Sequence, residues 1–272
     1  MKDRMAVAVL EAAEADGRLP PGGTVVEYTG GSTGTSLALV CAAKGYKITI
    51  VTSDAFSQEK RDHMRALGAE LIEVPSDRGR ITKELIQAMM ETARQISQQP
   101  DTYYADQFQN RDAATGYHPL GEEIWTQSGG NVASFVQVVG TAHSIEGVAT
   151  ALRGHNPDLR VVAVEPAESP VLSGGEPGAH KIEGIGVGFV PPLWNPGIAA
   201  EIALVPTEEA KAMARRLASE EALFAGTSSG ANVVAAIREA RRLGLGHTVV
   251  TLLVDSGLKY LTTDLYGSPS GR

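Results

Sequence analysis

The chain has 272 residues and a formal net charge of −8, with 43% hydrophobic and 21% charged residues, values typical of a globular protein with a substantial core. The acidic balance, without a block of like charges, argues against a nucleic-acid partner. A signal peptide or a membrane span is not expected, because the apolar run from Met5 to Leu10 is too short for either.

The first half of the chain alternates between predicted helices and strands. A helix is expected over residues 5–16, with Gly17 and Pro20 as its stop signal. The elements that follow are a β-branched strand beginning at Thr24, helix 35–44, strand 47–52, a helix capped by Ser57 and closed by Gly68, strand 69–74, a helix with apolar spacing from Ile81 to Ile96, and strand 103–105. This alternation predicts a parallel sheet that is covered by helices on both faces.

The second half repeats this scheme. Its predicted elements are helix 120–127, strand 135–139 (read as fully apolar), helix 145–153, strand 160–165, strand 202–205, a helix opened by Pro206 and Thr207 with the buried stripe Ala210, Met213, Ala214 and Leu217, a helix from Gly226–Gly230 to about Leu243, and strand 248–254. Residues 169–196 are rich in Gly and Pro without a sustained period, which is typical of a functional loop. The tail 267–272 is expected to fray. A domain break is expected near residues 108–112.

The single cysteine, Cys41, excludes an intrachain disulfide and fits a reducing compartment. It lies inside an apolar helix pattern, so we expect an inert core thiol and not a nucleophile. A cytoplasmic location is therefore expected.

Three glycine-containing turns, read as strand-to-helix turns, carry the chemical signal: 29–34, 140–144 and 226–230. In open parallel sheets, ligands bind at the carboxyl ends of the strands, where such turns gather. Glycines let the backbone approach a ligand, and hydroxyls with the N–H groups of a helix start can receive an anion. Neither the Rossmann nor the P-loop spacing is present. A plain turn and a capped helix start remain alternatives on these residues alone.

A longer stretch, VVAVEPAESPVLSGGEPGAHKIEGIGVGF at residues 161–189, resembles the cysteine synthase (O-acetylserine sulfhydrylase) and cystathionine β-synthase family of pyridoxal-phosphate enzymes. The similarity extends over essentially the whole chain and includes residues 2–6, 65–70, 107–108 and 255–257. It implies the α/β fold shared with the tryptophan synthase β subunit (fold type II), with two three-layer domains built on parallel sheets. Residues 1–108 would form a smaller domain with a substrate-carboxylate loop, and residues 109–272 a larger one with a phosphate loop.

The resemblance also implies the site residues. Lys2 matches the catalytic lysine that forms a Schiff base with pyridoxal phosphate, a role that requires a primary amine able to move protons. The implied cofactor-binding residues are Lys2, Ser32, Gly140, Thr141, Ala142, His143, Ser144 and Ser228. The implied substrate-binding residues are Thr29, Gly30, Thr33, Gln107 and Gly184. No metal site is implied.

Several positions depart from the family pattern. Ala142 and His143 replace two glycines of the phosphate loop, whose backbone donors survive if the local dihedrals do not require glycine. His143 either adds a proton or a charge near the phosphate or points to solvent. Gly30 stands where serine is usual and Ser32 where asparagine is usual, which shortens the reach of the loop. Glu183 stands where glutamine is common and would discourage a second anionic group nearby.

These features favour formation of L-cysteine from O-acetylserine, or another activated serine, and sulfide or a thiol. A neutral Ser228 hydroxyl facing the pyridine nitrogen suits β-elimination and β-replacement, as the resemblance implies. The alternatives are a serine or threonine dehydratase, a cystathionine β-synthase-type lyase, or, in another class, a non-catalytic or decayed paralogue. The family resemblance implies a homodimer.

The start of the chain generates one more expectation. A Schiff-base lysine needs packing on both sides, whereas residue 2 lies where chains normally fray. The family carries a further strand and helix upstream, ending in Asn-Pro and a serine. We therefore expect an N-terminal truncation of a working enzyme, which binds cofactor poorly and exposes part of its first sheet. The coding DNA upstream of Met1 checks this expectation.

Overall fold

The computed structural model describes residues 1–79 and 82–267 and divides into two compact units, Met1–Gly116 and Tyr117–Arg272. Within the described ranges, no helix combines the length and the apolar character that crossing a membrane would require. The predicted helix start at Ile81 and the predicted frayed tail, apart from Gly267, lie outside the described residues.

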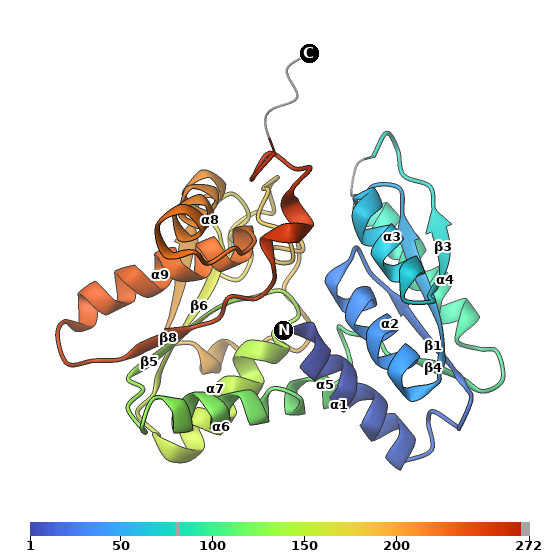
Figure 1. Cartoon of the computed structure of the whole chain (residues 1–272), viewed down its shortest axis with the longest axis horizontal. Coiled ribbons are helices and arrows are strands. Elements are labelled where there is room, and N and C mark those ends of the chain that lie inside the picture. Colours follow the sequence, from blue (N-terminus) through green and yellow to red (C-terminus); the bar gives the residue numbers. More distant parts are fainter. Residues whose placement is uncertain (80–81, 268–272) are drawn as a thin grey trace. The chain divides into compact units, whose positions relative to one another are not determined.

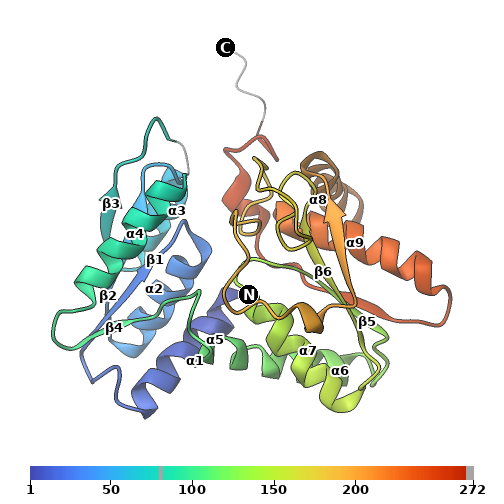
Figure 2. The same cartoon turned by 180° about the vertical axis from the view of Figure 1, so that it is seen from behind.

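The first unit is a parallel sheet with helices on both faces, as the alternating pattern predicts. Its elements are α1 (Lys2–Ala15), β1 (Thr24–Tyr28), α2 (Ser32–Lys44), β2 (Lys47–Ser53), α3 (Gln58–Ala66), β3 (Glu70–Val74), α4 (Lys83–Ile96), β4 (Thr102–Tyr104) and α5 (Asp112–Thr115). The strand order is β3-β2-β1-β4, with all pairs parallel. α2 lies in front of this sheet in Figure 1, and α4 lies in front of it in the reverse view of Figure 2.

The second unit has the same layered plan. Its elements are α6 (His118–Gln127), β5 (Ser134–Val138), α7 (His143–His155), β6 (Arg160–Pro166), the 3₁₀ turn η1 (Pro196–Ile198), β7 (Glu201–Val205), α8 (Thr207–Glu221), α9 (Thr227–Leu243), β8 (Val249–Thr251) and the 3₁₀ turn η2 (Gly257–Tyr260). The strand order is β7-β6-β5-β8, again parallel throughout. α8 and α9 cover one face of the sheet, and α6 and α7 cover the other (Figures 1 and 2).

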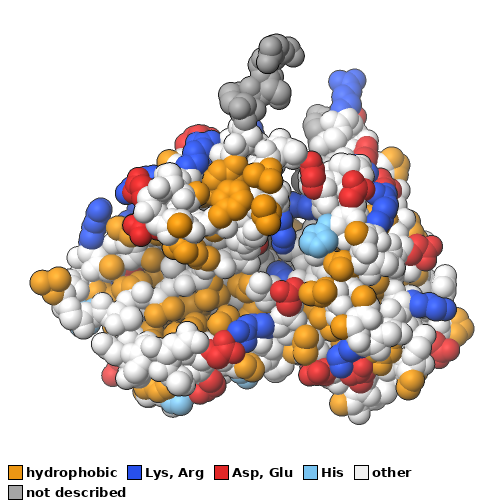
Figure 3. All heavy atoms as spheres, in the orientation of Figure 1, with side chains coloured by type: hydrophobic (Ala, Val, Ile, Leu, Met, Phe, Trp, Pro, Cys, Tyr) orange, Lys and Arg blue, Asp and Glu red, His pale blue; other side chains and the backbone are white. Residues whose placement is uncertain are grey.

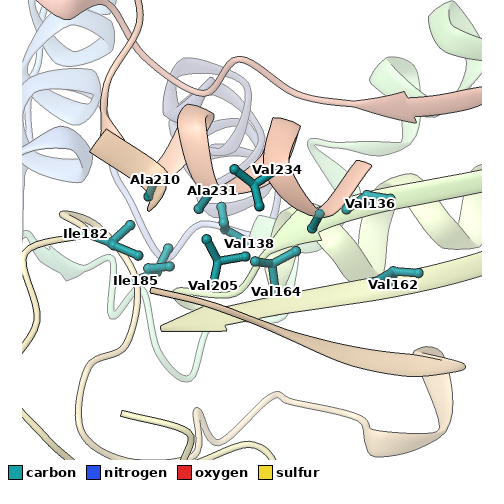
Figure 4. Packing of buried hydrophobic residues seen from close by; sticks show 11 residues of the cluster. Val136, Val138, Val162, Val164, Ile182, Ile185, Val205, Ala210, Ala231 and Val234 are labelled. Atoms are coloured by element: carbon teal, nitrogen blue, oxygen red, sulfur yellow. The ribbon is translucent and has the colours of Figure 1, made fainter. Parts of the chain in front are cut away.

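Small branched side chains form the core of the second unit. Figure 4 shows valines of β5, β6 and β7 facing the alanines and Val234 of α8 and α9, with Ile182 and Ile185 of the long loop closing one end. Burying such side chains stabilises each by about 1.5–3 kcal/mol relative to exposure. On the face shown in Figure 3, acidic and basic side chains are interspersed over both units.

The predicted helices and strands occur in the predicted order, the short helix α5 was not predicted, and three further details differ. The turn at 226–230 follows α8 and not a strand, because the segment before it makes only an isolated bridge, Ala225 to Ser256. β8 is shorter than predicted, since α9 side chains take its later backbone groups: Asn232 donates to the Leu252 carbonyl and Ser229 accepts from the Val254 N–H. Ser57 occupies the N-cap position of α3, but its hydroxyl makes no cap hydrogen bond.

Two single-residue expectations, an apolar strand at Gln137 and an inert thiol at Cys41, have opposite outcomes. Gln137 lies in the middle of the strand read as fully apolar, and it is completely buried, so that reading was wrong. Cys41 is buried in α2, and burial raises the pKa of its thiol to about 12. The thiol therefore stays protonated, which confirms the expectation of an inert core cysteine.

The first unit extends to Gly116, eight residues beyond the expected domain limit at residue 108. α5 packs against α1, and Gly116 lies so close to the Arg4 carbonyl oxygen that a Cβ atom there would be 2.6 Å from it. Residues 109–116 consequently belong to the first unit.

The α8–α9 crossing yields a stability prediction. A methyl group on Gly230 would overlap the Ala210 carbonyl oxygen, so we expect Gly230→Ala to lower the free energy of unfolding by about 1–3 kcal/mol. The control is Gly154→Ala in α7, where no atom lies within 4 Å of the added methyl; it should raise that free energy by about 0.5–1 kcal/mol. Urea unfolding measures both, and a Gly230→Ala protein as stable as the parent would contradict the close packing.

Candidate functional site

The loop at residues 29–34 joins the end of β1 to the first turn of α2. The Thr29 N–H donates to the Val51 carbonyl at 3.0 Å, and Thr29 Oγ1 accepts from the Gly31 N–H at 3.1 Å. A Cβ atom on Gly34 would lie 2.6 Å from the Thr29 methyl carbon, so no side chain fits there. The loop therefore holds the first N–H groups of α2 at the carboxyl edge of the sheet, where an anion can bind them.

Thr33 and Gln107, two predicted substrate-binding residues, contact each other. Thr33 Oγ1 donates to Gln107 Oε1 at 2.6 Å, and Gln107 Nε2 donates to the Tyr28 carbonyl at 3.1 Å. Among the described residues, the second N–H of this amide has no partner, and it remains available to a ligand.

Neighbouring side chains occupy the space beside Gly30 and Gly31. A Cβ atom on Gly30 would lie 2.6 Å from Cδ1 of Phe56, and one on Gly31 would lie 2.7 Å from Cδ of Lys60. The serine that is usual at the position of Gly30 would fit only if Phe56 moved. The departure at Gly30 thus has a steric reason.

Lys2 is the first residue of α1 and is half-buried. Asp3 ties this helix to α2, because its carboxylate accepts from the Ser36 hydroxyl at 2.5 Å. Burial lowers the pKa of Lys2 to about 8, and the charge of Glu27 acts in the opposite direction. An amine with this pKa is partly neutral near neutral pH, and a neutral amine is the form that nucleophilic attack and proton abstraction require.

Glu27 is a completely buried carboxyl group on β1. Its oxygens accept from the Tyr28 N–H at 2.8 Å and from the Gln107 N–H at 2.9 Å. Burial nevertheless raises its pKa to about 8, and the hydrogen bonds and the charge of Lys2 only partly offset this shift. Glu27 thus holds the end of β1 to the segment that carries Gln107.

In the second unit, the loop at residues 140–144 joins β5 to α7. Gly140 lies against the long loop, since a Cβ atom there would be 2.5 Å from the Gly184 carbonyl oxygen. Ala142 is the N-cap of α7, and the side chains of Thr141 and Ser144 are buried beside it. Gly140, a predicted cofactor-binding residue, thus lies next to Gly184, a predicted substrate-binding residue.

The two glycine replacements in this loop differ in their backbone. Ala142 has φ 71°, in the left-handed region that favours glycine, whereas His143 has an ordinary helical backbone. His143 is buried, and its Nδ1 lies 3.1 Å from Thr141 Oγ1, so the alternative in which it points to solvent is wrong. The loop keeps its geometry at the cost of strain at Ala142.

The long loop is pinned to the starts of two helices. Thr207 Oγ1 accepts from the Lys181 N–H at 3.2 Å, and Thr227 Oγ1 accepts from the Glu183 N–H at 3.1 Å. Thr227 directly precedes Ser228, which is buried in the first turn of α9, and Glu183 directly precedes Gly184. The second hydrogen bond therefore links the segment of Ser228 to the segment of Gly184.

Sequence reasoning missed Glu27, Phe56, Gln137 and Asn232. Gln137 offered the clearest signal, a polar residue in the middle of an apolar strand. Asn232 lies one turn beyond Ser228 in α9 and hydrogen-bonds to Gln137. The contact of Phe56 with Gly30 depends on the path of the chain after β2, for which the sequence carries no signal.

The chain is similar to known proteins over nearly its whole length. A model of the family described as "Pyridoxal-phosphate dependent enzyme" matches residues 1–255. Cysteine synthase from Staphylococcus aureus is 42% identical over 269 residues, which cover 98% of this chain and 84% of that protein. A crystal structure of cysteine synthase from Entamoeba histolytica has a TM-score of 0.92 and 35% identity, covering 100% of this chain and 80% of that one. A third relative, O-acetylserine-dependent cystathionine β-synthase from Helicobacter pylori, has a TM-score of 0.90 and 36% identity over 98% of this chain and 85% of that one.

The chain therefore belongs to the family of pyridoxal-phosphate-dependent enzymes. Within it, the fold is that of the tryptophan synthase β type, and the resemblance to cysteine synthases is confirmed. The predicted cofactor, pyridoxal phosphate, is that of the family.

The residues present fit the cofactor phosphate. The N-terminus of α7, a helix of 13 residues, presents N–H groups beside the hydroxyls of Thr141 and Ser144. The left-handed Ala142 directly before this helix turns successive N–H groups toward one side, as in anion-binding nests. The donor set is therefore suited to a dianion.

Relief of the strain at Ala142 generates a prediction. Ala142→Gly should raise the free energy of unfolding by about 1 kcal/mol, because a left-handed alanine costs about 1–2 kcal/mol and the unfolded chain gains some freedom. Ala222 at the C-cap of α8 has φ 57° and serves as a matched control, so Ala222→Gly should give a similar gain. A lower urea midpoint for Ala142→Gly alone would show that the loop needs the methyl group.

The raised pKa of Glu27 predicts a pH dependence. The folded protein keeps the Glu27 proton at pH values where the unfolded chain has lost it. The contribution of Glu27 to the free energy of unfolding is therefore most favourable below about pH 4.5 and falls as the pH rises toward 8. The neutral Glu27→Gln variant should therefore gain at least about 1 kcal/mol relative to the parent between pH 5 and pH 7.5. Urea unfolding at several pH values measures this, with Glu221→Gln, an exposed carboxylate, as the control. Equal pH slopes for the parent and Glu27→Gln would contradict it.

Proposed function

We propose that this protein is a pyridoxal-phosphate-dependent β-replacement enzyme that forms L-cysteine from O-acetylserine, or another activated serine, and sulfide. The observation that carries the proposal is Lys2, an amine whose pKa burial lowers to about 8, on a helix tied by Asp3 to α2. The first turn of α2 belongs to the loop that we assign to the substrate carboxylate.

The chain's residues divide the work as follows. Bound pyridoxal phosphate supplies an electron sink that weakens the Cα–H bond of the amino acid. Lys2 would hold the cofactor and take the Cα proton. Gly140 to Ser144 would bind the phosphate, and the Ser228 hydroxyl would hydrogen-bond the ring nitrogen. The loop at 29–34, with Ser32 assigned to the cofactor, would orient the substrate carboxylate together with the second N–H of Gln107.

The two units take separate parts in this proposal. The first, assigned from the sequence to residues 1–108 and compact to residue 116, carries the substrate-carboxylate loop, and the second carries the phosphate loop.

We also propose a homodimer, supported by the family resemblance and by an apolar area on the second unit in Figure 3. The lone buried Cys41 supports a cytoplasmic location.

A second nucleophile is worth testing. The resemblance to a cystathionine β-synthase supports a test of homocysteine as the nucleophile in place of sulfide. Release of pyruvate without either thioether or cysteine would indicate elimination in place of replacement.

The role of Lys2 is directly testable. Borohydride reduction of the cofactor-loaded protein should fix the cofactor mass on the peptide that contains Lys2, and Lys2→Ala should lower cysteine formation from O-acetylserine and sulfide by about 10²- to 10⁴-fold. Lys47→Ala, at an exposed position in the same unit, serves as the control and should behave as the parent. Attachment at another lysine, or undiminished turnover by Lys2→Ala, would contradict the assignment.

A further inference from the structure

We propose that Gln137 and Asn232 are positioning residues that direct the Ser144 hydroxyl proton toward the bound phosphate. The proposal rests on the proposed role of the loop at 140–144 and adds two side chains that the family resemblance does not assign. Both belong to the second unit and are completely buried.

The orientation of the Asn232 amide is fixed by backbone groups. Its Oδ1 accepts from the Val138 N–H at 2.7 Å, and its Nδ2 donates to the Leu252 carbonyl at 2.8 Å. A backbone N–H can only donate and a carbonyl can only accept, so the amide cannot be reversed. The direction of every further hydrogen bond in this group follows from these two.

Gln137 passes this direction on to the loop. Asn232 Nδ2 donates to Gln137 Oε1 at 3.0 Å, which leaves the Nε2 end of Gln137 facing Ser144. Nε2 donates to Ser144 Oγ at 3.0 Å. Ser144 is therefore an acceptor on the side of β5, and its single proton must point elsewhere.

The remaining direction is toward the anion site. Ser144 is the second residue of α7, where the unpaired N–H groups of the helix start gather. Among the described residues, the Ser144 proton has no partner, so a phosphate there would receive it as a charge-assisted hydrogen bond. Chains of hydrogen bonds polarise one another, and the donation from Gln137 strengthens the donation from Ser144.

Packing of the core alone does not require a polar side chain at position 137, since an apolar residue could fill the same buried position. Burying two amides is costly unless their hydrogen bonds are made, and the Gln137 side chain links Asn232 of α9 to Ser144 of the loop. This geometry accounts for a polar residue between the valines Val136 and Val138 of β5.

A double-mutant cycle tests the proposal. Apo-protein variants Gln137→Leu, Ser144→Ala and the double variant are titrated with pyridoxal phosphate, the Kd is measured by absorbance, and the ³¹P shift of the bound phosphate is recorded. Each single variant should weaken binding about tenfold. The double variant should bind no more weakly than Ser144→Ala alone, because Gln137 acts through that hydroxyl.

Controls separate this role from stability. Asn156→Ala removes a hydrogen bond to the Val132 carbonyl at the far end of α7; it should lower the urea midpoint without moving the ³¹P shift. Ser144→Thr keeps the hydroxyl and should preserve the coupling to Gln137. Additive losses in the cycle, or an unchanged ³¹P shift in Gln137→Leu, would overturn the positioning role alone. Failure of the parent protein to bind pyridoxal phosphate would overturn the proposed function and the positioning role with it.

Discussion

The backbone groups at the carboxyl ends of parallel strands have to be satisfied after the hydrogen bonds of the sheet stop, and both units depend on how this is done. In the first unit, the oxygens of the buried Glu27 carboxyl group accept hydrogen bonds from the Tyr28 and Gln107 N–H groups. In the second, the Asn232 side chain binds the Val138 N–H and the Leu252 carbonyl. Each unit thus uses one buried polar side chain to fix the edge of the sheet from which its glycine-containing loop, 29–34 or 140–144, starts.

The architecture could be predicted from the sequence because it follows from local patterns. Alternating strands and helices specify a parallel sheet, and the glycine-containing turns mark where ligands approach it. The sequence also predicted Thr33, Gln107, Gly140 and Gly184 as site residues. In the structure Thr33 contacts Gln107, and Gly140 contacts Gly184. The role of Lys2 came from resemblance, since a lysine near the start of a chain carries no such signal.

The parts that could not be predicted depend on distant contacts. Whether Ala142 needs a left-handed backbone is decided by the path of the loop between β5 and α7, and the burial of His143 by the same path. Gln137 was read as part of an apolar strand, because its partners Ser144 and Asn232 become neighbours only in the folded chain. Steric crowding of Gly30 by Phe56 is likewise invisible until the chain after β2 is placed.

The contact between Gly140 and the Gly184 carbonyl has a consequence for how this protein can diversify. Any side chain at position 140 would displace the long loop at Gly184, since its Cβ atom would lie 2.5 Å from that oxygen. The backbone path of the long loop at Gly184 therefore depends on a glycine at position 140. Side chains of the long loop can change without disturbing this contact, whereas a change of its backbone path there cannot occur independently of position 140.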